Sequence, residues 1–431
     1  MTDWRGVTER GAAVAVAILA ALSGVLVVNE WRDPSSSTPQ PAITESIAEV
    51  RPAEVAPPPA DASVQADATL QVAAEPAAEP VPEPAPAEEP AAASSAQLAS
   101  IDPAARDRLS AVLASWKTRH PDQLVGVIAD LAERETLPHS PAFLLSIAYA
   151  ETRGKILAVS PAGAVGLAQA TPAAYLSEGF EGKVFMTDSY LVGSRAYIMK
   201  KPLGDALTIA EPLLRRNNAV ERAHAKKLLA KAKALRTEGM DELEALRPVA
   251  NDTFHARIAE MDKHNVATLN ELERIVDRGA PRASLKRFHT RVQKDYRYYQ
   301  NLQTNGWSEY ERSLSARRDQ LLRNKFGQEP ERIFLTRQYE AGEYLGTALD
   351  ARFSPSKMAE FLSVHLATKQ RQAIELGLPE ENIEAWTAAL YNGGAVNIRR
   401  MQAGLIGKLT ETEKYMQTVP ARSARLQHAI G

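Results

Sequence analysis

Residues 33–97 constrain what this chain can fold into more than any other segment. The segment holds 13 prolines, and it carries eleven acidic side chains against one basic side chain, a net charge of −10. Such a composition cannot bury enough apolar surface to offset the entropy lost on ordering. We therefore expect residues 32–97 to be a disordered Pro/Ala/Glu-rich linker, with a polyproline-like stiffness and a reach of at most ~200 Å.

An uninterrupted apolar run precedes the linker. Residues 12–28 (AAVAVAILAALSGVLVV) are the short end of the length that a membrane-spanning helix needs. A cleaved signal peptide is the alternative, but its apolar region would be shorter and a small-x-small site would follow it. We predict a cytoplasmic head at 1–11 and a transmembrane anchor at 12–31. The protein would then be a single-pass inner-membrane protein with its bulk in the periplasm.

The composition of the whole chain excludes several classes of function. No cysteine is present, which removes disulfides, thiolate metal sites and cysteine nucleophiles. The 51 basic and 53 acidic side chains nearly cancel, which argues against a nucleic-acid binder. No HExxH pair occurs among the eight histidines, and we expect neither a metal nor an organic cofactor. The abundance of alanine, with Glu, Lys, Arg and Leu, predicts a mainly α fold after about residue 98.

A first motif lies between Ser140 and Gly154 (SPAFLLSIAYAETRG). Ser140 is a good N-cap, the proline after it suits the first helical position, and Gly154 can end the helix in a left-handed cap. Glu151 falls on the same face as Leu144 and Ile147. A carboxyl group on an apolar face loses hydration, its pKa rises, and it becomes suited to general acid catalysis at neutral pH. A glutamate that reaches solvent at the helix end is the alternative.

A second motif, SPAGAVGLAQ, spans residues 160–169. Gly163 and Gly166 permit close backbone approach or unusual dihedral angles. The spacing does not match a phosphate-binding loop. The Gln169 amide suits sugar hydroxyls or an N-acetyl group, although a purely structural turn is the alternative.

A third motif, ALYNGG, spans residues 389–394. Tyr391 continues the helical apolar spacing of the residues before it, and Gly393 or Gly394 can terminate that helix. The hydroxyl of a buried tyrosine needs a hydrogen-bond partner, and a carboxylic acid would serve. A tyrosine that is simply part of the core is the alternative.

Taken in this order, the motifs resemble the soluble-type lytic transglycosylases of cell-wall turnover. Two further segments fit the resemblance, EP at 329–330 through GEYL at 342–345, and ET at 411–412 with Tyr415. The resemblance covers about 120–179 and 329–420 and implies one lysozyme-like helical catalytic domain, whose two halves we place at 98–179 and 329–431. Thr152 replaces the usual Ser, Ala168 the usual Met, and Leu390 the usual Ala. The change at Ala168 puts the shape of the sugar subsites in doubt.

The resemblance also implies a substrate and a set of roles. The substrate is the peptidoglycan bond from N-acetylmuramic acid to N-acetylglucosamine, and the product is a 1,6-anhydro sugar. Glu151 acts as general acid and then as base, and Tyr391 orients it. Glu411 hydrogen-bonds the sugar that is cyclised. Asn392 supports the loop. The remaining residues expected at the sugar sites are Thr152, Ser160, Gly163, Gly166, Leu167 and Gln169.

Residues 180–328 form a long insertion between the two halves. The segments 221–236 and 268–278 predict amphipathic helices, with breaks at Gly279-Ala-Pro281 and at Asn305-Gly306. From Arg195 to Glu329 the chain carries 27 basic and 18 acidic side chains. The insertion is either a solvated helical hairpin or a docking arm for anionic glycans, for envelope surfaces or for an envelope protein partner. An aromatic stripe from Phe288 to Leu302 favours packing over sugar stacking.

Two rival functions stay open. A muramidase would use the same fold and the same glutamate, with water as nucleophile. A non-catalytic scaffold would bind peptidoglycan and recruit partners through the insertion. The departure at Ala168 favours the scaffold, whereas Glu151 and Tyr391 count against it.

Overall fold

A computed structural model describes residues 101–431 of the chain. The expected head, anchor and linker (1–11, 12–31 and 32–97) lie outside these residues. The described part is mainly helical, as the composition predicted, and it contains no β-strand. Two isolated bridges join Val159 to Val165 and Val165 to Ala170. Within residues 101–431, no helix combines the length and the apolar character that crossing a membrane requires.

The first four helices of the described chain are α2 (Pro103–Ser115), α3 (Pro121–Arg134), α4 (Pro141–Thr152) and α5 (Pro172–Ser177). Helix α4 begins as its sequence predicts, because the Ser140 hydroxyl accepts a hydrogen bond from the Phe143 N–H and Pro141 is the first helical residue. All residues from Pro141 to Tyr149 are buried. The last turn of α4, which carries Glu151, is therefore held by a helix fixed on all sides.

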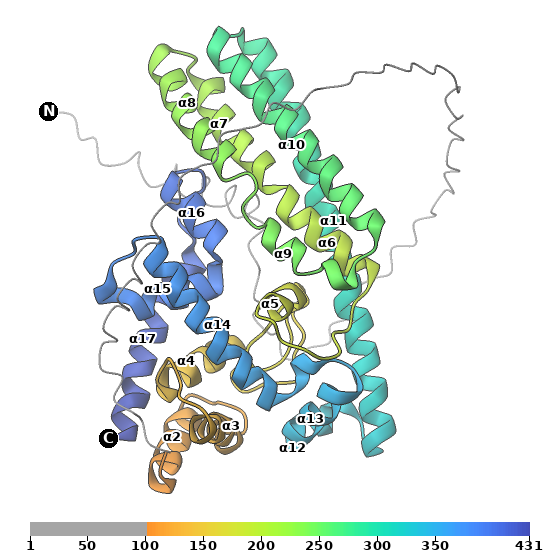
Figure 1. Ribbon diagram of the computed structural model, residues 1–431, viewed down its shortest axis with the longest axis vertical. Coiled ribbons are helices and arrows are strands. Elements are labelled where there is room, and N and C mark those ends of the chain that lie inside the picture. The colour runs from red at the N-terminus through yellow and green to blue at the C-terminus, as the bar shows by residue number, and fades with distance from the viewer. Residues whose placement is uncertain (1–100) are drawn as a thin grey trace, which may run out of the picture. The chain divides into compact units, whose positions relative to one another are not determined.

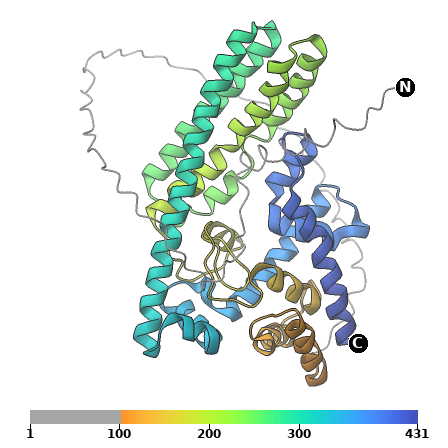
Figure 2. The same cartoon turned by 180° about the vertical axis from the view of Figure 1, so that it is seen from behind.

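Five α-helices and one short 3₁₀ helix follow between residues 180 and 280: α6 (Asp188–Met199), α7 (Lys201–Arg215), α8 (Ala219–Ala234), α9 (Met240–Glu244), η1 (Arg247–Val249) and α10 (Asp252–Arg278). Helix α11 (Arg282–Phe326) then runs unbroken for 45 residues. The break predicted at Gly279-Ala-Pro281 is confirmed, since Gly279 ends α10 in a left-handed conformation. Figure 2 shows α11 running past the other helices of the insertion.

The break predicted at Asn305-Gly306 is wrong. Gly306 lies inside α11, where this helix crosses α6. A Cβ atom at Gly306 would lie 2.4 Å from the backbone oxygen of Ser189 and 3.0 Å from the backbone nitrogen of Gly193. The glycine therefore permits a close crossing of two helices rather than a turn.

The described chain ends in six further α-helices and two short 3₁₀ segments: α12 (Pro330–Thr336), α13 (Gln338–Ala348), η2 (Ala351–Phe353), α14 (Pro355–Glu375), η3 (Glu380–Asn382), α15 (Ile383–Gly393), α16 (Ala395–Ala403) and α17 (Thr410–Ile430). Helix α15 ends at Gly393, and Gly394 follows with a positive φ of 72°, as the double glycine predicted. Helix α17 packs against α4 and α15, so segments far apart in sequence meet beside Glu151.

The insertion is divided between two hydrophobic cores. One core joins α2–α5, α13, α14 and α17 to α6 and to the C-terminal half of α11, through Tyr310, Leu314 and Leu322. A second core lies between α7, α8, α10 and the N-terminal half of α11. We call these four elements together the helical arm (Figure 1). A buried ion pair of 3.0 Å between Asp205 of α7 and Arg400 of α16 joins this arm to the end of the chain.

Candidate functional site

The carboxyl group of Glu151 is the centre of the candidate site. Glu151 lies two residues beyond the buried run that ends at Tyr149, and the Tyr415 hydroxyl donates a hydrogen bond of 2.6 Å to its Oε1 atom. Burial, together with the smaller effect of the nearby Glu411 charge, raises the pKa of Glu151 to about 7 against the opposing effect of the Tyr415 hydrogen bond. Near neutral pH the group is therefore divided between a proton donor and a proton acceptor.

Helix α17 supplies two of the groups around this carboxyl. Glu411 and Tyr415 are one helical turn apart and therefore share a face of α17. Burial, together with the Glu151 charge, raises the pKa of Tyr415 well above its usual range, so this hydroxyl stays a hydrogen-bond donor. Burial also raises the pKa of the half-buried Glu411. The ET-x-x-Y spacing had marked Tyr415, but no role was expected for it.

Tyr391 does not hold Glu151, contrary to expectation. Its hydroxyl donates instead to the backbone oxygen of Ala168, and so ties α15 to the second motif. The ring contacts His365 edge-on at 5.5 Å between centroids, and His365 is hydrogen-bonded at 2.6 Å to Glu178. Burial and the Glu151 charge raise the pKa of Tyr391 well above its usual range, which places the ring near that carboxyl.

The second motif forms a compact loop whose backbone is bonded to itself. Val165 and Ala170 exchange two backbone hydrogen bonds of 3.1 Å, and the Ser160 hydroxyl accepts one of 3.0 Å from the Ala164 N–H. Gly166 has a φ of 75°, and a Cβ atom there would lie 1.9 Å from the backbone oxygen of Arg352. The glycine is therefore required both by its dihedral angle and by the close approach.

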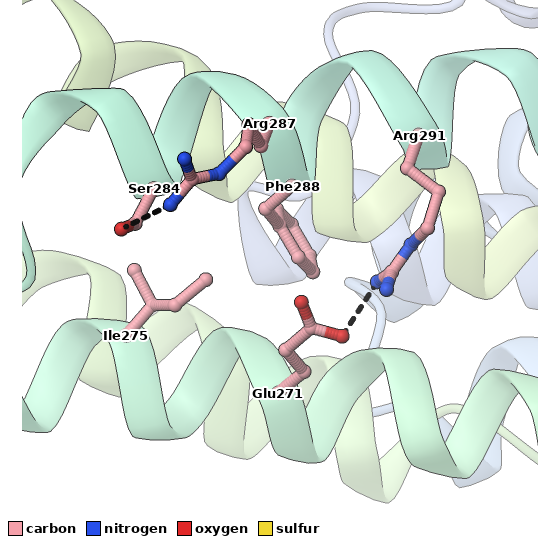
Figure 3. A pocket seen from close by; sticks show the side chains of 6 residues that line it. All are labelled: Glu271, Ile275, Ser284, Arg287, Phe288 and Arg291. Carbon is pink, nitrogen blue, oxygen red and sulfur yellow. Dashed lines mark hydrogen bonds and ion pairs between the residues drawn. The ribbon is translucent and has the colours of Figure 1, made fainter.

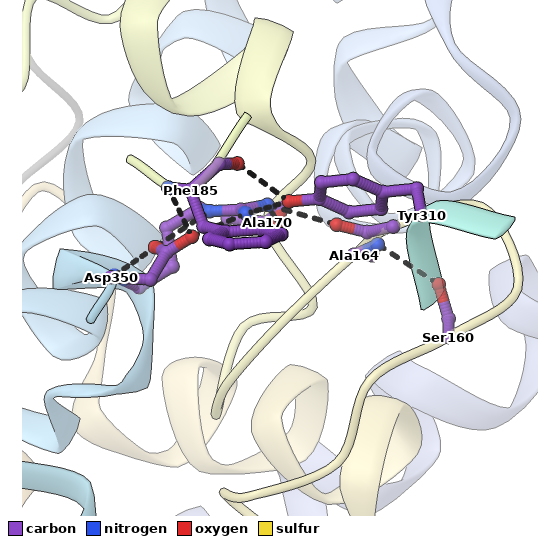
Figure 4. Close-up of polar contacts among 8 residues, drawn as sticks. Ser160, Ala164, Ala170, Phe185, Tyr310 and Asp350 are labelled. Atoms are coloured by element: carbon purple, nitrogen blue, oxygen red, sulfur yellow. Dashed lines mark hydrogen bonds and ion pairs between the residues drawn. The ribbon is translucent and has the colours of Figure 1, made fainter. Parts of the chain in front are cut away.

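A buried arginine fixes this loop from the opposite side. Arg352 and Asp350 form a fully buried ion pair of 2.7 Å (Figure 4). The Arg352 guanidinium also donates to the backbone oxygens of Gly163 at 2.8 Å and Ala170 at 2.9 Å, and to the Tyr310 hydroxyl at 2.6 Å. Because Tyr310 belongs to α11, the insertion takes part in shaping the loop. No local pattern in the sequence indicates this cluster.

The other residues expected at the sugar sites have varied surroundings. Leu167 is fully buried in the core, so it cannot contact a substrate. The Thr152 hydroxyl donates to the Ala148 oxygen at 3.1 Å and accepts from the Gly154 N–H, which closes the end of α4. Gln169, half-buried with a φ of 47°, donates through Nε2 to the Gly166 oxygen at 3.0 Å.

Asn392 lies at the end of α15 and joins that helix to α17. Its side-chain oxygen accepts a hydrogen bond of 3.1 Å from the hydroxyl of Thr412, the residue that follows Glu411. This contact joins two helices, so the role expected for Asn392 in supporting a loop stays a prediction. Glu151, Tyr391, Tyr415 and Glu411 come together from α4, α15 and α17, and the loop with Gln169 reaches them through Ala168.

Residues 101–431 hold no group of three or more His, Asp or Glu side chains arranged to bind a metal ion. Comparison of the chain with protein families, with curated proteins and with solved structures finds no match. The chemistry of the site must therefore be argued from its own residues.

Proposed function

We propose that this protein is a peptidoglycan lytic transglycosylase with a lysozyme-like catalytic domain. The observation that carries the proposal is the Glu151 carboxyl, which is held by the Tyr415 hydroxyl and has a pKa of about 7. A carboxyl group with this pKa can both give and take a proton at neutral pH.

Glu151 would act first as the general acid. Its proton passes to the glycosidic oxygen between N-acetylmuramic acid and N-acetylglucosamine, and the bond from that oxygen to C1 of the muramyl residue breaks. The Tyr415 hydrogen bond stabilises the carboxylate that this step leaves behind. Burial alone would raise the pKa of Glu151 further and make it a weaker acid, so Tyr415 tunes the group toward donation.

The resulting carboxylate would then act as the base. It takes the proton of the muramyl 6-hydroxyl, whose oxygen closes on C1 and gives the 1,6-anhydro product without consuming water. One carboxylate suffices because the nucleophile belongs to the substrate, in contrast to the usual pair of carboxylates in glycoside hydrolysis. Glu411, whose pKa is also raised by burial, would hydrogen-bond the sugar that is cyclised.

The loop at 160–170 would line the sugar sites. The Gln169 side-chain nitrogen is used within the loop, which leaves the side-chain oxygen to accept a hydrogen bond from a hydroxyl or an N-acetyl N–H. Tyr391 would position the loop rather than the acid. The predicted anchor and linker at 12–97 would hold this domain on the periplasmic side of the inner membrane, within reach of the glycan strands.

The test is the chemistry of the product. The full-length chain is incubated with purified peptidoglycan sacculi beside Glu151→Gln, and beside Glu413→Gln as a control that alters a carboxyl on α17 paired with Lys408. The released muropeptides are identified by mass spectrometry. We expect anhydro products from the wild type and the control, and none from Glu151→Gln. Products heavier by one water would instead identify a muramidase, and binding without any release would identify a scaffold.

A further inference from the structure

The far end of the helical arm gathers two turns of the chain. Residues 216–218 join α7 to α8, and residues 279–281 join α10 to α11. The Asn217 side chain donates a hydrogen bond of 3.0 Å to the Ala280 oxygen, and Lys226 pairs with Asp277 at 2.7 Å. Both turns therefore belong to one surface, which we call the arm tip and define as residues 211–227 and 271–291.

The arm tip is strongly basic. It carries eleven basic and five acidic side chains, a net charge of +6 out of the excess of nine over the whole insertion. Only Arg215, Lys226 and Arg291 have a carboxylate partner within residues 101–431. The other eight basic side chains have no carboxylate partner in that range. Arg278, Arg282 and Lys286 are among them, and all three are exposed. Neither turn contains an acidic residue.

A pocket of about 290 Å³ opens on this surface between α10 and α11 (Figure 3). Arg287 and Arg291 lie on one side, and the apolar side chains of Ile275 and Phe288 line the same space. Glu271 also lines the pocket and accepts a hydrogen bond of 2.6 Å from Arg291, whereas Arg287 has no carboxylate partner within residues 101–431 and donates to the Ser284 hydroxyl at 3.3 Å. An anionic group with a short apolar stem matches this combination of guanidinium and apolar surface.

An apolar side chain projects from the same surface. Val220, in the first turn of α8, is 75% exposed, the most exposed of the large apolar residues among those the structure describes. The two turns lie at one end of the helical arm (Figure 1), and the exposed Arg216, Arg278 and Arg282 lie in these turns or directly beside them. A projecting end with basic side chains around one apolar residue suits a flat anionic interface.

We propose that the arm tip binds the anionic headgroups of a phospholipid bilayer. Basic side chains at the tip attract the negative surface, Arg287 and Arg291 take a phosphate group, and Val220 enters the interface. Each basic residue near an anionic membrane contributes about fivefold to binding. The proposal is independent of the chemistry at Glu151, so it can fail or succeed whether or not the protein is a transglycosylase.

The test measures binding of the full-length chain to a second membrane. The chain is first inserted in nanodiscs of pure phosphatidylcholine, so that its predicted anchor at 12–31 is already embedded in lipid and does not insert into the test vesicles. It is then floated with vesicles of phosphatidylcholine and phosphatidylglycerol in equal parts, or of phosphatidylcholine alone. Arg278→Gln/Arg282→Gln/Lys286→Gln is compared with Arg312→Gln/Arg317→Gln/Arg323→Gln. The control removes three exposed basic charges from the other end of α11.

We expect the wild type and the control to bind the phosphatidylglycerol vesicles and not the neutral ones. The tip variant should bind at least tenfold more weakly, and up to about 100-fold. Equal binding to both vesicle types, or equal binding by the two triple variants, would overturn the proposal. Binding to soluble polyphosphate in the absence of any vesicle binding would also overturn it, in favour of an anionic polymer.

Discussion

Replacement of Tyr415 by phenylalanine tests how the environment sets the proton affinity of Glu151. The Tyr415 hydroxyl lowers the pKa of Glu151 by a hydrogen bond of 2.6 Å, against burial that raises it to about 7. A hydrogen bond to a charged group contributes about 1.5–3 kcal/mol. Since one pKa unit corresponds to ~1.4 kcal/mol, Tyr415→Phe should raise the pKa of Glu151 by about one to two units.

The activity should follow this change in a defined direction. A general acid must be protonated, so the rate should fall as the pH rises through the pKa of Glu151. In Tyr415→Phe the fall should occur about one to two pH units higher than in the wild type. The assay is the rate of anhydro-muropeptide release against pH, normalised to the maximum of each variant. A direct titration of Glu151 by NMR of ¹³C-labelled glutamate gives the same information without activity.

Tyr391→Phe is the matched control for this experiment. Its hydroxyl donates to the Ala168 oxygen and not to the Glu151 carboxyl, although both rings lie near that group. We expect the pKa of Glu151 to stay in place in this variant, even if the rate falls because the loop shifts. The reasoning is refuted if the titration of Glu151 does not move in Tyr415→Phe, or if it moves to lower pH.

Three further predictions concern stability, each measured by thermal or denaturant unfolding. The folded wild type loses stability as the pH rises from about 4.5 to 7, because the buried Glu151 carboxyl resists ionisation. Glu151→Gln removes this loss, so it should stabilise the fold by at most about 3 kcal/mol at pH 8 and by almost nothing at pH 4. An equal effect at both pH values would contradict this. Gly306→Ala should destabilise by about 1–3 kcal/mol, whereas Gly126→Ala, with open space beside its helix, should stabilise by about 0.5–1 kcal/mol. Gly166 and Gly179 both have a positive φ, but only Gly166 has other atoms close to an added Cβ. Gly179→Ala should therefore lower the free energy of unfolding by about 1–2 kcal/mol, and Gly166→Ala should lower it by about 2 kcal/mol more. Equal losses in the two variants would mean that the loop at 160–170 shifts to accommodate the new methyl group.

Local signals in the sequence were sufficient for some of the helix ends. Ser140 with Pro141, and Gly279 with Pro281, act through hydrogen bonds and dihedral angles within a few residues, so their effect is visible in the sequence itself. The break predicted at Asn305-Gly306 was wrong for the opposite reason, because a distant contact decides the structure there. The pair is typical of a turn, and only the contact with α6, more than 100 residues away, keeps it helical.

The sequence was sufficient to predict that Glu151 lies on a buried helix face, but not which side chains contact it. The apolar face of α4 marked Glu151. Which tyrosine hydroxyl reaches it depends on how α15 and α17 pack on α4, and the spacing along each helix does not determine that. Arg352 is harder still, because its burial depends on Asp350, on two loop carbonyls and on Tyr310 of the insertion. A charged residue in isolation predicts exposure.

The continuity of α11 has a geometric consequence. Its first residue, Arg282, belongs to the arm tip, and Tyr310 on the same helix contacts the Arg352 guanidinium that holds the loop at 160–170. An α-helix rises ~1.5 Å per residue, so ~42 Å of rigid helix separate these two points. A surface held at the arm tip would therefore stand at a fixed height from the loop. Under the proposed function, α11 would then restrict cleavage to glycan strands at one distance from that surface. Removing or adding two whole turns in the arm helices would change that height by ~11 Å.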